Sequence, residues 1–178
     1  LRHRKVSKAE ARQIAIDVFR AVGISMPEQR IDSYSWELSG GLRQRAIIAM
    51  ALSCNPRLLI ADEPTTAIDV TTQAQILKLL RRLQEERQTS IIFITHDLGV
   101  IAQMADEVVV MYLGMVMERG PVMTIFKDAR HPYTQALLRS IPSVQSTPRV
   151  KLPTIAGSIA HPFNRPSGCP FHPRCTRF

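Results

Sequence analysis

The chain has 178 residues, a formal net charge of +8 and 45% hydrophobic residues. This length suffices for one domain with a proper core, or for one and a half small ones. No N-terminal stretch resembles a signal peptide, and the uncharged run 108–117 is about half as long as a membrane-spanning helix requires. We therefore expect a chain that is soluble or that meets a membrane only through a partner. Because it begins with Leu1 rather than Met, we expect a fragment.

The positive charge is concentrated at the C-terminal end. From residue 129 onward there is no Asp or Glu, against six Arg and one Lys, and eight of the twelve prolines lie there. A basic arm for nucleic acid is one interpretation. We favour a solvated irregular coil, because the segment has no Lys/Arg run and few aromatic residues for base stacking. Three cysteines do not suggest a disulfide framework.

The first predicted element is a helix that begins at a capping box, residues 7–10. Its apolar face has a spacing of four residues: Ile14, Val18 and Val22. Gly23 is a typical C-terminal stop. Residues 27–37 predict a loop with a short helix, in which Tyr34 and Trp36 would serve as bulky packing anchors.

A second helical pattern follows Ser39-Gly40-Gly41 and ends before Asn55-Pro56. Glycines allow a backbone to approach a ligand closely, and a helix N-terminus offers free N–H groups to an anion such as phosphate. Three residues of this helix are core candidates: Ile47, Ile48 and Met50. Cys54, at its end, is expected to be a buried free thiol.

Two uncharged runs predict buried strands, one that begins at Leu58 and one at 90–95. The first ends in Asp62 and Glu63, and the second ends at His96. The intervening helix has one apolar face, formed by Ile76, Leu77, Leu80 and Leu83. Its charged face, which includes Lys78, Arg81, Arg82, Glu85 and Glu86, is expected to be solvated. In an open α/β sheet, ligands bind at the carboxyl edge, where both strands end.

The remaining pattern continues the alternation of helix and strand. We expect a helix at 98–104, a strand at 107–112 and a hairpin return at 115–118 on the sheet edge. A helix then runs from Gly120-Pro121 to Phe126. The fold class is therefore α/β with a mostly parallel sheet.

These motifs together resemble the ATP-binding-cassette (ABC) ATPases. Leu38-Ser39-Gly40-Gly41 with Gln44 resembles their signature motif, and residues 58–64 resemble their Walker B strand. Residues 66–69 resemble the D-loop, and Thr95-His96-Asp97 resembles the switch histidine. The resemblance implies a partial nucleotide-binding domain with part of the helical signature subdomain and a loop-rich C-terminal extension.

The resemblance also implies a role for each motif residue. Asp62 would hold Mg²⁺, usually through a water, and Glu63 would orient or deprotonate the attacking water. His96 would hydrogen-bond the γ-phosphate and that water, and Asp69 would couple the two sites of a dimer. The signature residues would contact the nucleotide of a partner ATPase in trans: Ser39, Gly40, Gly41 and Gln44.

One family feature is missing from the sequence. It contains no Gly-x-x-x-x-Gly-Lys-Ser/Thr segment, the P-loop that cradles phosphates. A P-loop supplies several charge-assisted hydrogen bonds of roughly 1.5–3 kcal/mol each. Losing two of them weakens binding on the order of 10²–10⁴-fold. We therefore expect no ATPase activity from this chain by itself.

The C-terminal segment narrows the resemblance to the dipeptide and oligopeptide importers. Residues 131–138 resemble the start of their C-terminal extension, and residues 168–175 resemble its cysteine motif. In that subfamily such cysteines imply a [4Fe–4S] cluster, of which Cys169 and Cys175 would supply half of the ligands. Zinc with His172, or plain reduced thiols, are the alternatives.

The sequence thus predicts part of the ATP-hydrolysing subunit of a bacterial peptide importer, using ATP and Mg²⁺ at the cytoplasmic side of the inner membrane. Expected partners are a second ABC ATPase subunit, two transmembrane permease subunits and, indirectly, a solute-binding protein, but no nucleic acid. Residues 1–128 would belong to the nucleotide-binding domain, with the signature subdomain at about 1–55 and the Walker B to switch region at about 56–128. Residues 129–178 would form the extension. The alternative is a non-catalytic docking module, and a soluble ABC protein of DNA repair or translation is disfavoured by 131–138.

Overall fold

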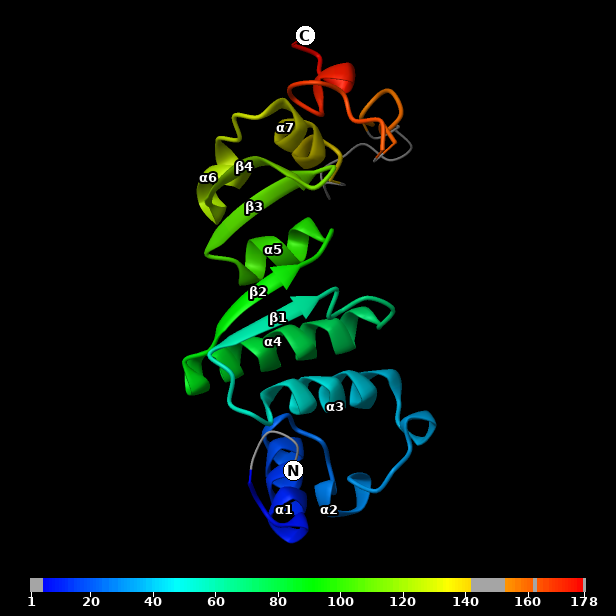
Figure 1. The fold of residues 1–178 in the computed structure, drawn as a ribbon, viewed down its shortest axis with the longest axis vertical. Coiled ribbons are helices and arrows are strands. Elements are labelled where there is room, and N and C mark those ends of the chain that lie inside the picture. Colours follow the sequence, from blue (N-terminus) through cyan, green and yellow to red (C-terminus); the bar gives the residue numbers. More distant parts are fainter. Residues whose placement is uncertain (1–4, 142–152, 162, 178) are drawn as a thin grey trace. The chain divides into compact units, whose positions relative to one another are not determined.

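The computed structural model describes residues 5–141, 153–161 and 163–177. The chain divides into two units, residues 1–96 and residues 97–178, and each is described separately. Both units contain helices and strands, as the α/β prediction requires (Figure 1). None of the described helices is long and apolar enough to cross a membrane.

The first unit begins with the helix α1, Lys8–Ala21, followed by the short helices α2, Pro27–Arg30, and η1, Ser35–Glu37. The predicted capping box is confirmed, because Ser7 and Glu10 exchange hydrogen bonds with each other's backbone amides. Gly23 has φ +75°, the left-handed conformation that favours glycine after a helix end.

Two arginines from later helices bind the carboxyl end of α1. The Arg45 guanidinium donates to the carbonyl of Val22 at 2.6 Å, and Arg82 donates to the carbonyl of Ala21 at 2.6 Å. Cations at a helix C-terminus satisfy its free carbonyls and complement its dipole. Since Val22 is fully buried, this helix end is fixed both by packing and by charge.

The helix α3, which begins at the predicted signature residues, spans Gly40–Leu52, with Ser39 as its N-cap. Ile48 is buried as predicted, but the core assignment is wrong for Ile47 and Met50, which are 53% and 66% exposed. The helix carries apolar residues on more than one face, so its sequence does not reveal which face is covered. Cys54 is exposed rather than buried, because it lies past the end of the helix.

Tyr34 and Trp36 are not packing anchors within the described part of this chain. Their rings stack on each other, with centroids 4.4 Å apart, but the residues are 63% and 74% exposed. The loop holds the two rings outside the core, so each ring is shielded from water only on the face that it turns toward the other ring.

The strands β1, Leu58–Asp62, and β2, Ser90–Ile94, pair in parallel, with Leu58 opposite Ser90 and Asp62 opposite Ile94. The helix α4, Val70–Arg87, runs along one face of this pair (Figure 1). Its predicted apolar face is confirmed, with buried residues Ile76, Leu77, Leu79, Leu80 and Leu83. The prediction of fully buried strands is wrong for the described residues, because alternate side chains point away from α4 and stay exposed.

The second unit contains α5, Leu98–Met104, and an antiparallel hairpin of β3, Glu107–Tyr112, and β4, Met115–Pro121. It continues with α6, Val122–Lys127, α7, Pro132–Arg139, and η2, His172–Arg174. The predicted hairpin is confirmed. Among the described residues it forms a sheet of its own rather than the edge of the β1–β2 pair.

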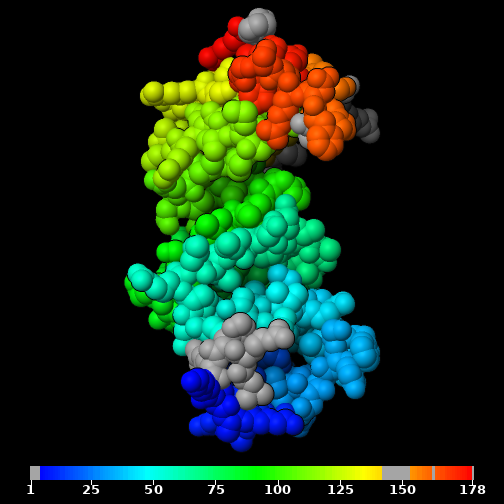
Figure 2. Space-filling model, viewed as in Figure 1, coloured from blue at the N-terminus to red at the C-terminus, as the bar shows by residue number. Residues whose placement is uncertain are grey.

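Residues 153–161 and 163–177 are mostly exposed and irregular, as expected of a solvated coil, but the part around Phe171 packs onto this second unit. Phe171 is 2% exposed and contacts the rings of Tyr112 and Tyr133. Arg174 donates to the Tyr112 hydroxyl at 3.2 Å and to the carbonyl of Ile155 at 2.9 Å. The expected loop-rich extension, 129–178, lies partly outside the described residues. A space-filling view of the chain is given in Figure 2.

Candidate functional site

The carboxyl ends of β1 and β2 bring two predicted site residues together. Parallel pairing ends both strands at the same edge, and the backbone amide of Glu63 donates to the carbonyl of Ile94 at 2.9 Å. Glu63 has φ +46°, so the chain turns sharply as it leaves β1. His96 Nδ1 lies 2.7 Å from Glu63 Oε1.

The Glu63 carboxylate is held from two sides. The Thr66 hydroxyl donates to Oε2 at 2.7 Å, while His96 contacts Oε1. The hydrogen bond from Thr66, followed by that from His96, holds the pKa of Glu63 below its usual value. Glu63 is therefore ionised at neutral pH. The His96 side chain is 84% exposed, so the pair is open to a ligand or to water.

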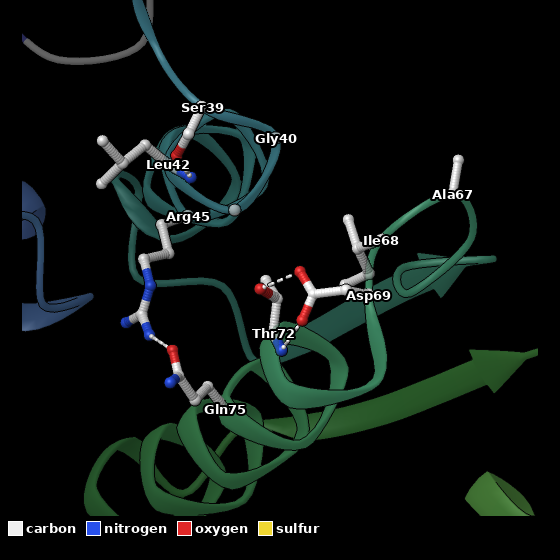
Figure 3. Close-up of a pocket in the computed structure, with 10 residues that line it drawn as sticks. Ser39, Gly40, Leu42, Arg45, Ala67, Ile68, Asp69, Thr72 and Gln75 are labelled. Carbon is white, nitrogen blue, oxygen red and sulfur yellow. Dashed lines mark hydrogen bonds between the residues drawn. The ribbon is translucent and has the colours of Figure 1, made fainter.

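A second part of the site lies at the N-terminus of α3. The Ser39 hydroxyl accepts a hydrogen bond from the amide of Leu42 at 3.4 Å. A cavity of about 340 Å³ opens here (Figure 3). It is lined by Ser39, Gly40, Gly41, Leu42, Arg45, Ala67, Ile68, Asp69, Thr72 and Gln75.

The loop that carries Asp69 forms the opposite wall of this cavity (Figure 3). Asp69 is the N-cap of α4 and accepts hydrogen bonds from the Thr72 amide at 2.9 Å and from the Thr72 hydroxyl at 2.6 Å. The hydroxyl of Thr72, followed by its amide, lowers the pKa of Asp69. Asp69 therefore remains charged at neutral pH beside the first turn of α3.

Comparison of the chain's sequence with protein-family models identifies its family. The family model of the ABC transporter matches residues 1–66, and the model of the oligopeptide/dipeptide transporter C-terminal region matches residues 117–178. The chain belongs to the ABC transporter family.

Curated relatives resemble this ABC family member over nearly its whole length. The oligopeptide transport ATP-binding protein OppD of Bacillus subtilis is 54% identical, over 96% of the chain and 48% of OppD. The dipeptide transport ATP-binding protein DppD of Escherichia coli is 48% identical, over 97% of the chain and 53% of DppD. The chain spans about half the length of the curated relatives it matches.

A solved structure supports the fold. A metal-chelate type ABC transporter in an inward-facing conformation aligns with a TM-score of 0.64 at 23% identity, covering 75% of this chain and 50% of that one. The α/β fold class of an ABC ATPase is thereby confirmed.

Not every predicted signature residue of the ABC motif reaches the cavity. Ser39, Gly40, Gly41 and Asp69 line it, but Gln44 is absent from its lining and Arg45 is present. Gly41 and Arg45 are four residues apart and share a helix face, whereas Gln44 is turned by about 100° from Arg45. The sequence reasoning missed Arg45, Thr72 and Gln75. Helical spacing from Gly41 could have indicated Arg45.

The C-terminal cysteines of this ABC protein belong to no metal-ligating group of three or more residues in the described part of the chain. Cys169 is exposed, and its Sγ lies 4.0 Å from His131 Nε2, while His172 Nδ1 lies 2.9 Å from the Cys169 carbonyl oxygen. Cys175 is half-buried. Among residues 5–141, 153–161 and 163–177, no group of three or more His, Cys, Asp and Glu residues is placed to hold a metal ion.

Proposed function

We propose that this chain provides the signature, Walker B, D-loop and switch part of the ATP-hydrolysing subunit of a bacterial dipeptide or oligopeptide importer. The observation that carries the proposal is the contact between Glu63 and His96 at the strand edge. Support for the transporter class comes from the two matched family segments, of which residues 117–178 correspond to the peptide transporter region.

In this proposal Glu63 is the general base of ATP hydrolysis. Its lowered pKa keeps it ionised and able to accept a proton from the attacking water. His96 fixes one carboxylate oxygen and offers its other ring nitrogen to a γ-phosphate. Thr66 fixes the second oxygen, so the carboxylate has one defined orientation.

Asp62 fits the role of the magnesium residue. Its carboxylate is an oxygen donor of the kind Mg²⁺ prefers, and it is exposed at the end of β1, beside the base. When bound, the ion would neutralise charge on the phosphates. The protein's own contribution is to hold a carboxylate at the strand end, where the ion and its water shell have access.

The P-loop that grips ATP is not in this sequence, so the complete site requires another segment. We propose that Ser39, Gly40 and Gly41 present the N-terminus of α3 to nucleotide held by a second ABC ATPase subunit. Asp69, on the facing wall, would link the two sites. Gln44 would act outside the cavity.

The assembly that we propose places this subunit on the cytoplasmic side of the inner membrane. It would bind two transmembrane permease subunits, which a solute-binding protein supplies with peptide. The domain boundary that we propose is at residue 128, with the peptide-importer extension following it.

The residues present do not fit a [4Fe–4S] cluster. Such a cluster takes four cysteine ligands, whereas the sequence holds three cysteines, of which only Cys169 and Cys175 belong to the unit 97–178. No step of the proposed reaction depends on these thiols.

The proposal is tested by Glu63→Gln in the full-length protein that carries the P-loop, assembled with its permease partners. Loss of the base should lower Mg-ATP hydrolysis by about 10²–10⁴-fold while ATP still binds. Glu85→Gln, exposed on α4, is the matched control and should hydrolyse ATP normally. Hydrolysis by Glu63→Gln within about twofold of the parent would refute the assignment.

A further inference from the structure

Gly40 and Gly41 stand in different surroundings, although they are adjacent in the first turn of α3. A Cβ atom added at Gly41 would lie 2.8 Å from the Cγ2 methyl of Thr72, closer than real Cβ atoms approach other heavy atoms. A Cβ added at Gly40 would meet nothing within 4 Å. Both residues are helical, so a left-handed backbone is not the reason for either glycine.

Thr72 cannot easily move away from Gly41. Its hydroxyl donates to Asp69 Oδ2 at 2.6 Å, and its amide donates to Asp69 Oδ1 at 2.9 Å (Figure 3). Rotating the methyl group away from α3 would also rotate the hydroxyl away from Asp69, because both groups are attached to Cβ. Added bulk at Gly41 is therefore transmitted to the Asp69 loop.

A second contact joins the same two helices one turn further along. Arg45 Nη2 donates to Gln75 Oε1 at 3.4 Å (Figure 3). The same guanidinium donates through Nη1 to the carbonyl of Val22. Arg45 follows Gly41 by four residues and Gln75 follows Thr72 by three, so each pair shares a helix face. The two contacts therefore hold one face of α3 against one face of α4.

We propose that Gly41 is glycine because α3 must touch the Thr72 methyl, and that Thr72 is the positioning residue that ties the signature helix to Asp69. Gly40 has open space on the side where a Cβ atom would stand. An effect of this packing on ATP hydrolysis rests on the proposed function, in which Ser39 and Asp69 both act on the ATP of a partner subunit. The packing of Gly41 against Thr72 does not depend on the proposed function.

The test uses the full-length protein and thermal unfolding, read without nucleotide. Gly41→Ala should lower the melting temperature by about 3 °C or more relative to Gly40→Ala, because overpacking opposes an otherwise equal gain in helix propensity. The rescue variant is Gly41→Ala with Thr72→Ser, which removes Cγ2 but keeps the hydroxyl for Asp69. Relative to Thr72→Ser alone, its melting temperature should change by the same amount, within about 1 °C, as Gly40→Ala changes that of the parent.

Gly41→Ala with Thr72→Val is the matched control, because valine retains the bulk and should not rescue. Equal melting temperatures for Gly41→Ala and Gly40→Ala, or a failure of serine to rescue, would overturn the proposal. In an active assembly, the serine rescue should also restore kcat with the KM for ATP unchanged. If the protein hydrolyses no ATP, the proposed function fails, while the melting pattern still decides the packing inference.

Discussion

At the scale of single residues, the charge of Asp69 is linked to one hydroxyl group. The pKa of Asp69 is lowered, first by the Thr72 hydroxyl and then by the Thr72 amide. A carboxylate with a lowered folded-state pKa stabilises the fold above its unfolded pKa of about 3.9. That stabilisation is lost as the pH falls through the lowered pKa of the folded state. The loss therefore occurs below about pH 4.

Replacing Thr72 with Val should therefore raise the pKa of Asp69 toward its ordinary value, because the strongest donor is removed while the amide remains. Carboxyl-carbon NMR titration of Asp69 measures this directly. Thr72→Ser keeps the donor and should leave the titration near that of the parent. If the titration midpoint of Asp69 were unchanged in Thr72→Val, the Thr72 hydroxyl would not be the cause of the lowered Asp69 pKa.

At the scale of elements, the start of α7 depends on a side chain from β4. Glu118 accepts hydrogen bonds from the backbone amides of Arg130 at 2.7 Å and His131 at 3.2 Å. These amides directly precede α7, so the carboxylate fixes the angle at which the chain enters the helix. Glu107, on the neighbouring strand, instead forms an exposed ion pair with Arg119.

Glu118→Ala should lower the free energy of unfolding by about 1–3 kcal/mol, because two backbone donors lose a charged acceptor. Hydrogen exchange in residues 132–139 should also become faster. Glu107→Ala is the matched control and should change stability by about 1 kcal/mol at most, since exposed ion pairs contribute little. Equal effects of the two substitutions would refute the proposed role of Glu118.

The sequence predicted the elements better than their burial. The helix at 98–104 and the strand at 107–112 are confirmed at both ends, because apolar periodicity and turn residues bound them. The burial of Ile47 and Met50 was predicted wrongly, since periodicity reveals an apolar face but not whether another element covers it. The exposed ring pair at 34–36 was missed for the same reason.

The candidate site was predicted as a set of motifs but not as a set of contacts. Parallel strands bring Glu63 and His96 to one edge, so their proximity follows from the fold class. The contact between Gly41 and Thr72 joins helices about thirty residues apart along the chain. No local sequence pattern predicts a contact between distant helices, so this contact could be found only from the structure.

At the scale of the whole molecule, the proposed signature acts on a partner. Ser39→Arg adds bulk and positive charge at the N-terminus of α3, where phosphate would approach. In a paired assembly, hydrolysis at the partner's P-loop should fall by more than about tenfold, while the subunit's own site still binds ATP. Single-turnover assays in which one of the two ATP sites is inactivated measure hydrolysis at the partner's site separately from ATP binding at the subunit's own site. Loss of the subunit's own ATP binding alone would indicate a role in cis.

The one-sided β1–β2 pair has a consequence for how this chain behaves in solution. The uncovered face carries four large aliphatic side chains, each 47–62% exposed: Leu58, Ile60, Ile92 and Ile94. Apolar strands with free edges recruit further strands, so concentrated samples of this chain alone should scatter light and bind hydrophobic dyes. Colloidal behaviour, more than unfolding, would then limit the concentration at which it can be handled.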